Sequence, residues 1–279
     1  MKDKVWFITG CSTGFGRELS LMALEMGYRV AVASRNLADI EDITNKYKER
    51  ALAVQLDMTK PAELKDSVDK ILNAFGRIDI LVNNAGIGYF ASMEESKEAE
   101  VRKMFEVNFF GLTALTQHVL PTMRKQKSGH IVNVSSIGGL VGFPAVSFYN
   151  ATKFAVAGLS EALAKETAHL GISVTIVCPS GFRTDWAGRS ANEDSVEIED
   201  YKETAGANRN NIRNNSGKQA GDPVRAAKEI IAMTESEKHP LYLLLGTASY
   251  NAAKKKLQDL ENNFDAWKDA AINSDFPKG

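Results

Sequence analysis

Short apolar runs alternate with longer amphipathic segments through the first 180 residues. Runs rich in β-branched and aromatic side chains predict strands at residues 5–8, 29–33, 52–56, 80–82, 130–134 and 173–177. Several are apolar without alternation, which is typical of strands covered on both faces. Stretches between them, such as 17–26 and 59–75, have helix length, and the second offers Thr59 as an N-cap ahead of Pro61. This order predicts an α/β fold with right-handed crossovers and a doubly wound parallel sheet.

The segment 183–221 interrupts this alternation. It is polar and rich in Asn and Gly, yet it carries scattered apolar side chains that include Trp186 and Ile212. Long irregular segments in compact domains are usually lids or linkers, and this one is too apolar for a linker. We therefore expect 183–221 to be a substrate lid.

The rest of the chain predicts two helices and a last strand. Asp222-Pro223, an N-cap followed by a proline, starts a helix, and 240–245 completes a sheet of about seven strands. Residues 247–279 are expected to form a C-terminal helical extension. Its apolar stripe is Leu257, Leu260, Phe264 and Trp267. We expect that stripe to pack against the sheet or a subunit neighbour, and the whole chain, 1–279, to form a single three-layer α/β/α domain of the Rossmann type.

Composition and charge narrow the class of protein. With 44% hydrophobic residues, the chain has enough apolar material for a large core. Its 34 basic and 35 acidic residues give a formal net charge of -1, so no broad attraction to nucleic acid or an anionic membrane is expected. No apolar run approaches the ~18 residues that span a bilayer. Cys11 and Cys178 lack metal or redox spacing and the four histidines are scattered, so we expect a cytoplasmic protein without a metal site.

A glycine-rich turn follows the first predicted strand directly. It contains Gly10, Ser12, Thr13, Gly14, Phe15 and Gly16. Glycines at a strand–helix junction let the backbone approach a pyrophosphate, and the helix N-terminus supplies N–H groups. The spacing G-x-x-x-G-x-G departs from the G-x-G-x-x-G of many dehydrogenases. A tight turn that binds nothing therefore stays open as the alternative.

The end of the second predicted strand bears on the choice of cofactor. An acidic residue at this place, about twenty residues past the glycines, would accept from the ribose of NAD. The chain has Ser34, Arg35 and Asn36 instead. A guanidinium suits a 2′-phosphate, and the two neighbours can add hydrogen bonds. This favours NADP(H), with a solvated surface arginine as the other interpretation.

Tyr149 and Lys153 stand at i and i+4, so a helix places both on one face. A free tyrosine has a pKa of ~10. An ammonium ~4 Å away at an effective dielectric of ~20 contributes ~4 kcal/mol, which would lower that pKa by about three units, into the range of efficient acid–base catalysis. Ser136 ends the fifth strand, at the edge where open α/β sheets bind ligands, and Asn108 is a further polar residue in apolar context. We expect these four residues to be catalytic.

With these residues assembled, the chain resembles the compact, single-domain subclass of the short-chain dehydrogenase/reductase family, closely over residues 4 to about 185. The resemblance implies that Tyr149 exchanges the proton with the substrate oxygen and that Ser136 polarises the carbonyl. It implies that Lys153 binds the nicotinamide ribose and that Asn108 anchors a water relay. It also implies cofactor contacts from Asp57, Met58, Asn84, Ala85, Gly86, Pro179, Phe182 and Thr184. Members of the family often have Pro-Gly after the sixth strand. This chain has Pro179-Ser180-Gly181 there instead.

Together these observations predict an oxidoreductase that moves a hydride between NADP(H) and the carbonyl or secondary alcohol of a small, apolar substrate, with reduction favoured. Phe143 and Trp186 fit a pocket rim and a plain core equally well. We expect a homodimer or homotetramer, although the C-terminal extension interferes with pairing of terminal strands. A catalytically silent NADP(H)-binding sensor or scaffold stays open. Epimerisation or dehydration of a nucleotide sugar is disfavoured by the glycine spacing and the length.

Overall fold

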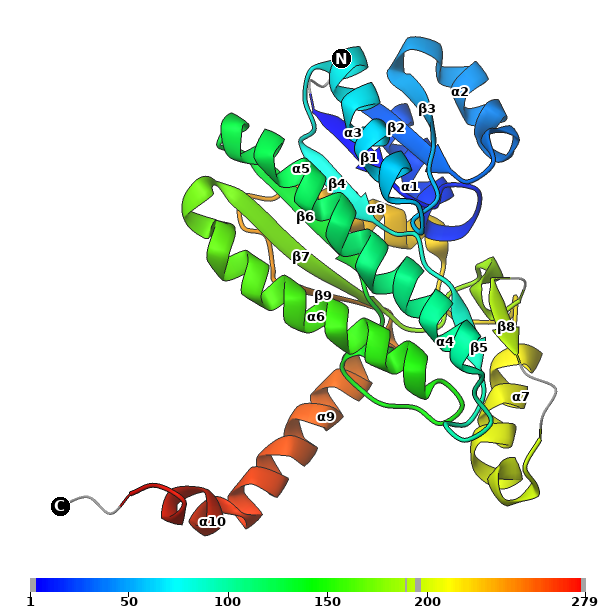
Figure 1. The fold of residues 1–279 in the computed structure, drawn as a ribbon, viewed down its shortest axis with the longest axis vertical. Coiled ribbons are helices and arrows are strands. Elements are labelled where there is room, and N and C mark those ends of the chain that lie inside the picture. The colour runs from blue at the N-terminus through cyan, green and yellow to red at the C-terminus, as the bar shows by residue number, and fades with distance from the viewer. Residues whose placement is uncertain (1–3, 189, 194–196, 277–279) are drawn as a thin grey trace.

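The computed structural model describes residues 4–188, 190–193 and 197–276, and it confirms the predicted fold class (Figure 1). Seven parallel strands form the main sheet in the order β3-β2-β1-β4-β6-β7-β9. Their bounds are β1 Val5–Ile8, β2 Arg29–Ser34, β3 Ala51–Gln55, β4 Ile80–Asn83, β6 Gly129–Val134, β7 Ile172–Pro179 and β9 Tyr242–Leu245. The chain moves outward from β1 to β3 and then returns to β4, so a crevice opens at the carboxyl ends of β1 and β4.

Helices cover both faces of this sheet. One face carries α1 (Gly14–Glu25), α2 (Glu41–Tyr47) and α8 (Pro223–Glu235). The other carries α3 (Pro61–Phe75), α5 (Leu112–Gln126) and α6 (Ser147–Thr167). A further helix, α4 (Glu98–Phe105), runs into α5 through a π-helical turn at Glu106–Gly111. The result is the expected three-layer arrangement.

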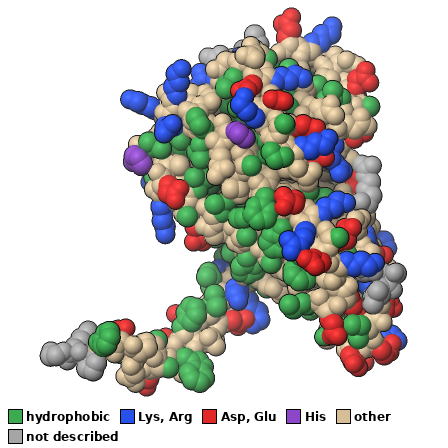
Figure 2. Space-filling model, viewed as in Figure 1, with side chains coloured by type: hydrophobic (Ala, Val, Ile, Leu, Met, Phe, Trp, Pro, Cys, Tyr) green, Lys and Arg blue, Asp and Glu red, His purple; other side chains and the backbone are tan. Residues whose placement is uncertain are grey.

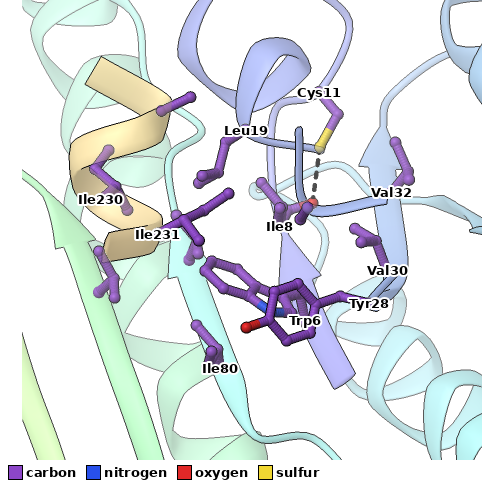
Figure 3. Packing of buried hydrophobic residues seen from close by; sticks show 14 of the residues in the cluster. Trp6, Ile8, Cys11, Leu19, Tyr28, Val30, Val32, Ile80, Ile230 and Ile231 are labelled. Atoms are coloured by element: carbon purple, nitrogen blue, oxygen red, sulfur yellow. Dashed lines mark hydrogen bonds between the residues drawn. The ribbon is translucent and has the colours of Figure 1, made fainter. Parts of the chain in front are cut away.

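Successive side chains of the central strands enter two different cores. On β1, Trp6 and Ile8 face α1 and α8, whereas Val5 and Phe7 face α3 and α5. Trp6 packs against Tyr28 with ring centroids 5.7 Å apart, deep under the helix pair (Figure 3). Because both faces of these strands are buried, their sequences lack polar alternation.

The structure corrects one helix start and confirms another. Lys60, not Thr59, precedes α3, and it makes no side-chain cap bond. Thr59 turns back instead, since its backbone N–H and its hydroxyl both donate to Asp57 Oδ1, at 3.0 and 2.8 Å. Asp222 caps α8 as predicted, accepting from the backbone N–H of Val224 at 2.9 Å.

The segment 183–221 has more regular structure than expected. It contains β8 (Ala191–Glu193), α7 (Ala207–Asn214) and short 3-10 and π-helical turns. Strand β8 pairs in parallel with β5 (Gly88–Phe90) and so lies beside the loop that follows β4. Arg213 on α7 ties the segment together, because its guanidinium donates to the carbonyls of Ala187, Gly188 and Ala191.

The C-terminal helix α9 (Thr247–Ala266) leaves the body after β9 and projects away from it, followed by α10 (Lys268–Asn273) (Figure 1). Its first turns are anchored, since Ser249 is buried and donates its hydroxyl to the carbonyl of Cys178 at 2.7 Å. The predicted stripe does not pack against the sheet, because Phe264 and Trp267, beyond the sheet edge, are 64% and 68% exposed.

The helices in the described part of the chain include none that is both long and apolar enough to cross a membrane.

Candidate active site

The glycine turn joins the carboxyl end of β1 to the first turn of α1. Gly10 and Gly14 have φ of 70° and 59°, in the left-handed region that favours glycine. A Cβ at Gly10 would lie 2.9 Å from the Cα of Ala85. Helix α1 starts at Gly14, and Thr13 makes no side-chain cap bond, so the first backbone N–H groups of the helix are not capped by that side chain. The turn has the shape and polarity of a phosphate cradle.

The loop after β4 is bonded directly to this turn. Thr9 Oγ1 accepts from the backbone N–H groups of Asn84 and Ala85, each at 3.0 Å. The Asn84 side chain donates back to the carbonyls of Thr9 and Gly10, at 2.8 and 3.1 Å. The two halves of the crevice therefore have a fixed separation, set by one asparagine and one threonine.

Arg35 lies at the far end of the same crevice, directly after β2. Its charge reaches Asp57, where burial raises the carboxyl pKa but hydrogen bonds from Thr59 and the charges of Lys60 and Arg35 together lower it. Asn36, the third residue predicted to contact the cofactor here, is engaged in a local bond. It is not among the cavity-lining residues, and its side chain caps the next 3-10 turn by accepting from the backbone N–H of Ala38 at 3.3 Å.

Tyr149 lies in the first turn of α6, facing the carboxyl end of β6. Its ring is 9% exposed and its centroid lies 4.8 Å from that of Trp186. Ser136 follows β6 and accepts from the backbone N–H of Gly138 at 3.0 Å, which fixes its side chain beside the tyrosine. Ser135 has a structural role, since its hydroxyl donates to the Lys153 carbonyl at 3.0 Å.

Lys153 lies one helical turn after Tyr149, as the spacing predicts. Its Nζ donates to the carbonyl of Val134 at 2.8 Å and lies 5.7 Å from the centre of the Tyr149 ring. A Cβ placed on Gly86 would lie 3.6 Å from that Nζ and 3.3 Å from Asn108 Oδ1. Gly86 therefore gives the ammonium group room beside the loop after β4.

Asn108 lies in the π-helical turn between α4 and α5. Its Oδ1 accepts from the backbone N–H of Ile87 at 2.8 Å, and its Nδ2 donates to the Ile87 carbonyl at 2.9 Å and to Thr152 at 3.2 Å. π-helical turns of this kind are frequent at functional sites. Asn108 thus links the loop after β4 to the helix that carries Tyr149 and Lys153.

The protonation states differ from our prediction. Burial raises the pKa of Tyr149 to about 12, against a smaller lowering by its hydrogen bond with Ser136. Burial also lowers the pKa of Lys153 to about 8. The expected strong coupling of the two groups is wrong for this geometry, because the ammonium is directed at Val134 and both side chains are enclosed by protein, which disfavours their charged forms.

One cavity of about 870 Å³ runs from Arg35 to Tyr149 and Trp186. It is lined by nearly all the predicted cofactor residues: Gly10, Ser12, Thr13, Gly14, Phe15, Ser34, Asp57, Met58, Asn84, Ala85, Gly86, Lys153, Pro179, Phe182 and Thr184. Gly16 is the other exception, since it packs behind the turn against Gly10 and Asn84. The volume suits a sizeable ligand, and the glycine cradle fits a dinucleotide.

The segment 183–221 supplies lining residues that sequence reasoning missed. Asn208, Asn211 and Ile212 line the cavity from α7, and Asn215 lines it directly after the helix. Their spacing at i, i+3, i+4 and i+7 was the available signal for one helix face. Gln219 also lines the cavity, and its Oε1 is buried without a hydrogen-bond partner. Phe143 and Trp186 prove to be cavity residues rather than plain core.

The Cys11 thiol is enclosed in the fold rather than presented at the helix start. The Cys11 thiol is buried, its Sγ donates to the Ile8 carbonyl at 3.0 Å, and burial raises its pKa to about 12. A reactive thiol at the helix start is therefore excluded. Among the described residues, no group of three or more His, Cys, Asp or Glu side chains could hold a metal ion.

Fold and site together define a dinucleotide-dependent oxidoreductase, and comparison with known proteins agrees. The family described as short chain dehydrogenase matches residues 4–195, and the chain belongs to this family. It is 36% identical to the oxidoreductase BOA17 of Botryotinia fuckeliana over 97% of this chain and 99% of that one. It is 40% identical to the 3-ketodihydrosphingosine reductase of Bacteroides thetaiotaomicron over 73% of this chain and 74% of that one.

Solved structures show the same similarity. A short-chain dehydrogenase from Streptomyces avermitilis superposes with a TM-score of 0.91 over 98% of both chains at 37% identity. ElxO with NADP bound gives a TM-score of 0.71 at 30% identity, over 87% of this chain and 96% of that one. The 3-ketoacyl-(acyl-carrier-protein) reductase of Brucella melitensis, complexed with NADH, gives 0.72 at 26% identity, over 86% and 96%. Similar proteins thus bind either nicotinamide dinucleotide.

Proposed function

We propose that this oxidoreductase uses NADP(H) to reduce the carbonyl group of a small organic substrate to a secondary alcohol. The observation that carries the proposal is one cavity in which Tyr149, Ser136 and Lys153 lie at one end, with the glycine cradle and Arg35 toward the other. Bound nicotinamide would supply or accept the hydride. The chain would supply binding, orientation and the proton.

Arg35 supports the choice of NADP(H) over NAD(H). It follows β2 at the cavity rim, the place where a carboxylate would accept from the 2′-hydroxyl of NAD. A guanidinium there would bind a 2′-phosphate through charge-assisted hydrogen bonds, with Ser34 beside it. Asp57 and Met58 would border the adenine on the same rim.

The proton transfer follows from the protonation state of Tyr149. With a pKa of about 12, the phenol is protonated throughout the neutral range, so it is poised to donate its proton to a substrate oxygen. Ser136 would hold the same oxygen by a second hydrogen bond. Lys153 would hold the nicotinamide ribose hydroxyls, while Asn108 positions the loop behind it.

The substrate would enter between the segment 183–221 and the loop before α6. Trp186, Ile212 and Phe143 line this mouth and form an apolar contact surface. We propose that 183–221 is the substrate-binding lid of a single domain. The two cysteines are free and buried, and we propose a reducing compartment such as the cytoplasm. We also propose a homodimer or homotetramer, as the similarity to the family implies.

The test is a panel of ketones and aldehydes assayed with NADPH and NADH by absorbance of the reduced cofactor. Tyr149→Phe is expected to lower kcat/KM about 10²–10⁴-fold, the usual contribution of a general acid, while the Kd for NADPH changes little. Tyr47→Phe, on α2 and outside the cavity-lining set, is the matched control. Retained activity in Tyr149→Phe would contradict the role of Tyr149 as the proton donor. NADPH binding without turnover of any carbonyl would contradict the proposal as a whole and favour a silent sensor.

A further inference from the structure

Glu95 is a buried carboxylate that lies outside the cavity. It is 9% exposed, it is not among the cavity-lining residues, and it belongs to the turn between β5 and α4. Carboxylates are seldom buried this deeply unless hydrogen bonds satisfy their oxygens, because the loss of hydration is costly. The partners of the two Glu95 oxygens therefore indicate its role.

Each carboxylate oxygen of Glu95 accepts a backbone N–H from a different segment of the chain. Oε2 accepts from Ser92 at 2.9 Å, within the same turn. The Ser92 hydroxyl accepts in return from the backbone N–H of Glu95 at 3.3 Å. Oε1 accepts from Ile198 at 2.8 Å, and this bond crosses to the segment 183–221. One oxygen thus fixes the carboxylate on its own turn, and the other connects that turn to 183–221.

Arg209 extends this connection to α7. It is 8% exposed, and its guanidinium pairs with Glu197, the residue before Ile198. Burial raises the pKa of the Glu95 carboxyl, but its hydrogen bonds and the charge of Arg209 together bring that pKa below its ordinary value. Glu95 is therefore ionised at neutral pH, and its charge acts on two points of 183–221, the Ile198 amide and α7.

Helix α7 reaches from this contact to the substrate end of the cavity. Asn208, next to Arg209, lines the cavity and donates its amide to the Pro144 carbonyl at 2.8 Å, across the mouth. Ile212, one turn later, lines the cavity and packs against the apolar cluster that contains Tyr149. A displacement of α7 would therefore change the surroundings of the reacting carbonyl.

Other carboxylates near α7 lie at the surface. Glu199 and Asp200 are exposed, and acidic side chains are seen on the surface at this end of the molecule (Figure 2). Glu94 accepts from the hydroxyl of Tyr201 at 2.9 Å, but it is exposed as well. Water and salt weaken exposed charged contacts. Among these carboxylates, the buried Glu95 is therefore the one whose contact should fix the position of α7.

We infer that Glu95 is a positioning residue for substrate binding, which fixes α7 over the substrate end of the cavity from outside it. The inference rests on the proposed function of 183–221 as the substrate lid. The glycine turn follows β1 and Arg35 follows β2, toward the other end of the cavity. Loss of the bond between Glu95 and Ile198 should therefore weaken substrate binding and leave cofactor binding unchanged.

Two substitutions remove this bond from opposite sides. Glu95→Gln keeps the size of the side chain but leaves one acceptor oxygen, so it cannot accept from both Ser92 and Ile198. Ile198→Pro removes the backbone N–H, and the φ of Ile198, −91°, is close to the range of proline. Glu98→Gln is the matched control, since Glu98 is 77% exposed and pairs with Arg102 within α4.

The first experiment is amide hydrogen exchange on the full chain. In Glu95→Gln the protection of amides 197–214 should fall about 10–100-fold, as for the loss of a hydrogen bond to a charged group, while the strands of the main sheet keep theirs. Glu98→Gln should exchange as wild type does. Ile198→Pro, which changes no core residue, gives the same measurement if Glu95→Gln unfolds the body. Unchanged protection of 197–214 would overturn the inference.

The second experiment compares the KM for a carbonyl substrate with the Kd for NADPH. Glu95→Gln and Ile198→Pro should each raise KM about 10-fold, with kcat and the Kd for NADPH within about 3-fold of wild type. The double variant should have the KM of the single variants, because both substitutions remove one bond.

Three results of this experiment would overturn the inference: an unchanged KM, an equal loss of NADPH affinity, or additive effects of the two substitutions. Amide exchange needs no turnover. If wild type reduces no carbonyl, the proposed function fails, and amide exchange alone decides whether Glu95 fixes α7.

Discussion

His130 lies on β6, five residues before Ser135, and is 3% exposed. Its Nε2 lies 2.9 Å from Thr175 Oγ1, whose own hydroxyl donates to the carbonyl of Pro240 at 2.7 Å. Thr175 therefore accepts from His130, and Nε2 carries the proton. Nδ1 is buried without a hydrogen-bond partner, so a second proton on this ring would meet no acceptor.

This environment makes stability depend on pH. Burial, then the charges of His239 and Lys4, lower the pKa of His130 from 6.5 to about 3. Because the folded pKa lies below the unfolded one, the stabilisation is complete above pH 6.5 and is lost as the pH falls toward 3. Each pH unit in that window removes about 1.4 kcal/mol, so the loss at pH 4.5 is about 2–3 kcal/mol from this residue alone.

The assay is urea unfolding at pH 7.5 and pH 4.5 for wild type and His130→Gln, which keeps a donor toward Thr175 but does not titrate. Wild type should lose about 2–3 kcal/mol more between the two pH values than the variant does. His118→Gln, at an exposed position on α5, is the control and should behave as wild type. Equal losses in wild type and His130→Gln would show that His130 is charged or solvated in the folded protein, and would refute the reasoning.

Three other substitutions test the site and the fold. Arg35→Asp should lower kcat/KM for NADPH about 10–100-fold, as expected for charge-assisted hydrogen bonds of ~1.5–3 kcal/mol. The kcat/KM for NADH should be unchanged or higher. An unchanged ratio of the NADPH and NADH values would exclude Arg35 from the phosphate site. Because the pKa of Lys153 is near 8, kcat/KM for reduction should fall above pH 8 as the ammonium group deprotonates. Lys153→Arg should abolish this fall. If the variant shows the same fall above pH 8, another group causes it. Lys127 ends α5 with a φ of 53°, in the left-handed region that favours glycine. Lys127→Gly should therefore raise the unfolding free energy by about 0.5–1 kcal/mol, measured by urea unfolding. A lower unfolding free energy would show that the lysine backbone is not strained here.

The sequence predicted those parts of the fold that depend on local pattern. Apolar runs without alternation identified the strands, because the chain buries both faces of the sheet. The apolar run of β1 also showed where this strand ends, and so located the glycine turn that follows it. The spacing of Tyr149 and Lys153 required only a helix, and α6 provides it.

What the sequence could not provide depends on contacts between distant segments. The order within 183–221 comes from Arg213 bonding to carbonyls more than twenty residues away, and no local pattern reports that. The predicted coupling of Tyr149 and Lys153 assumed a partly solvated pair, whereas the Val134 carbonyl takes the ammonium. The start of α9 is anchored by the bond from Ser249 to the carbonyl of Cys178, and the apolar stripe of the helix gave no sign of this contact.

The three tryptophans of the chain occupy three different environments. Trp6 is fully enclosed in the core, Trp186 touches Tyr149 in the cavity, and Trp267 is 68% exposed at the end of α9. Their fluorescence should accordingly differ in emission wavelength and in access to a dissolved quencher. Variants that keep a single indole would let one optical signal follow unfolding, ligand entry or the surroundings of α9 separately, without any attached dye.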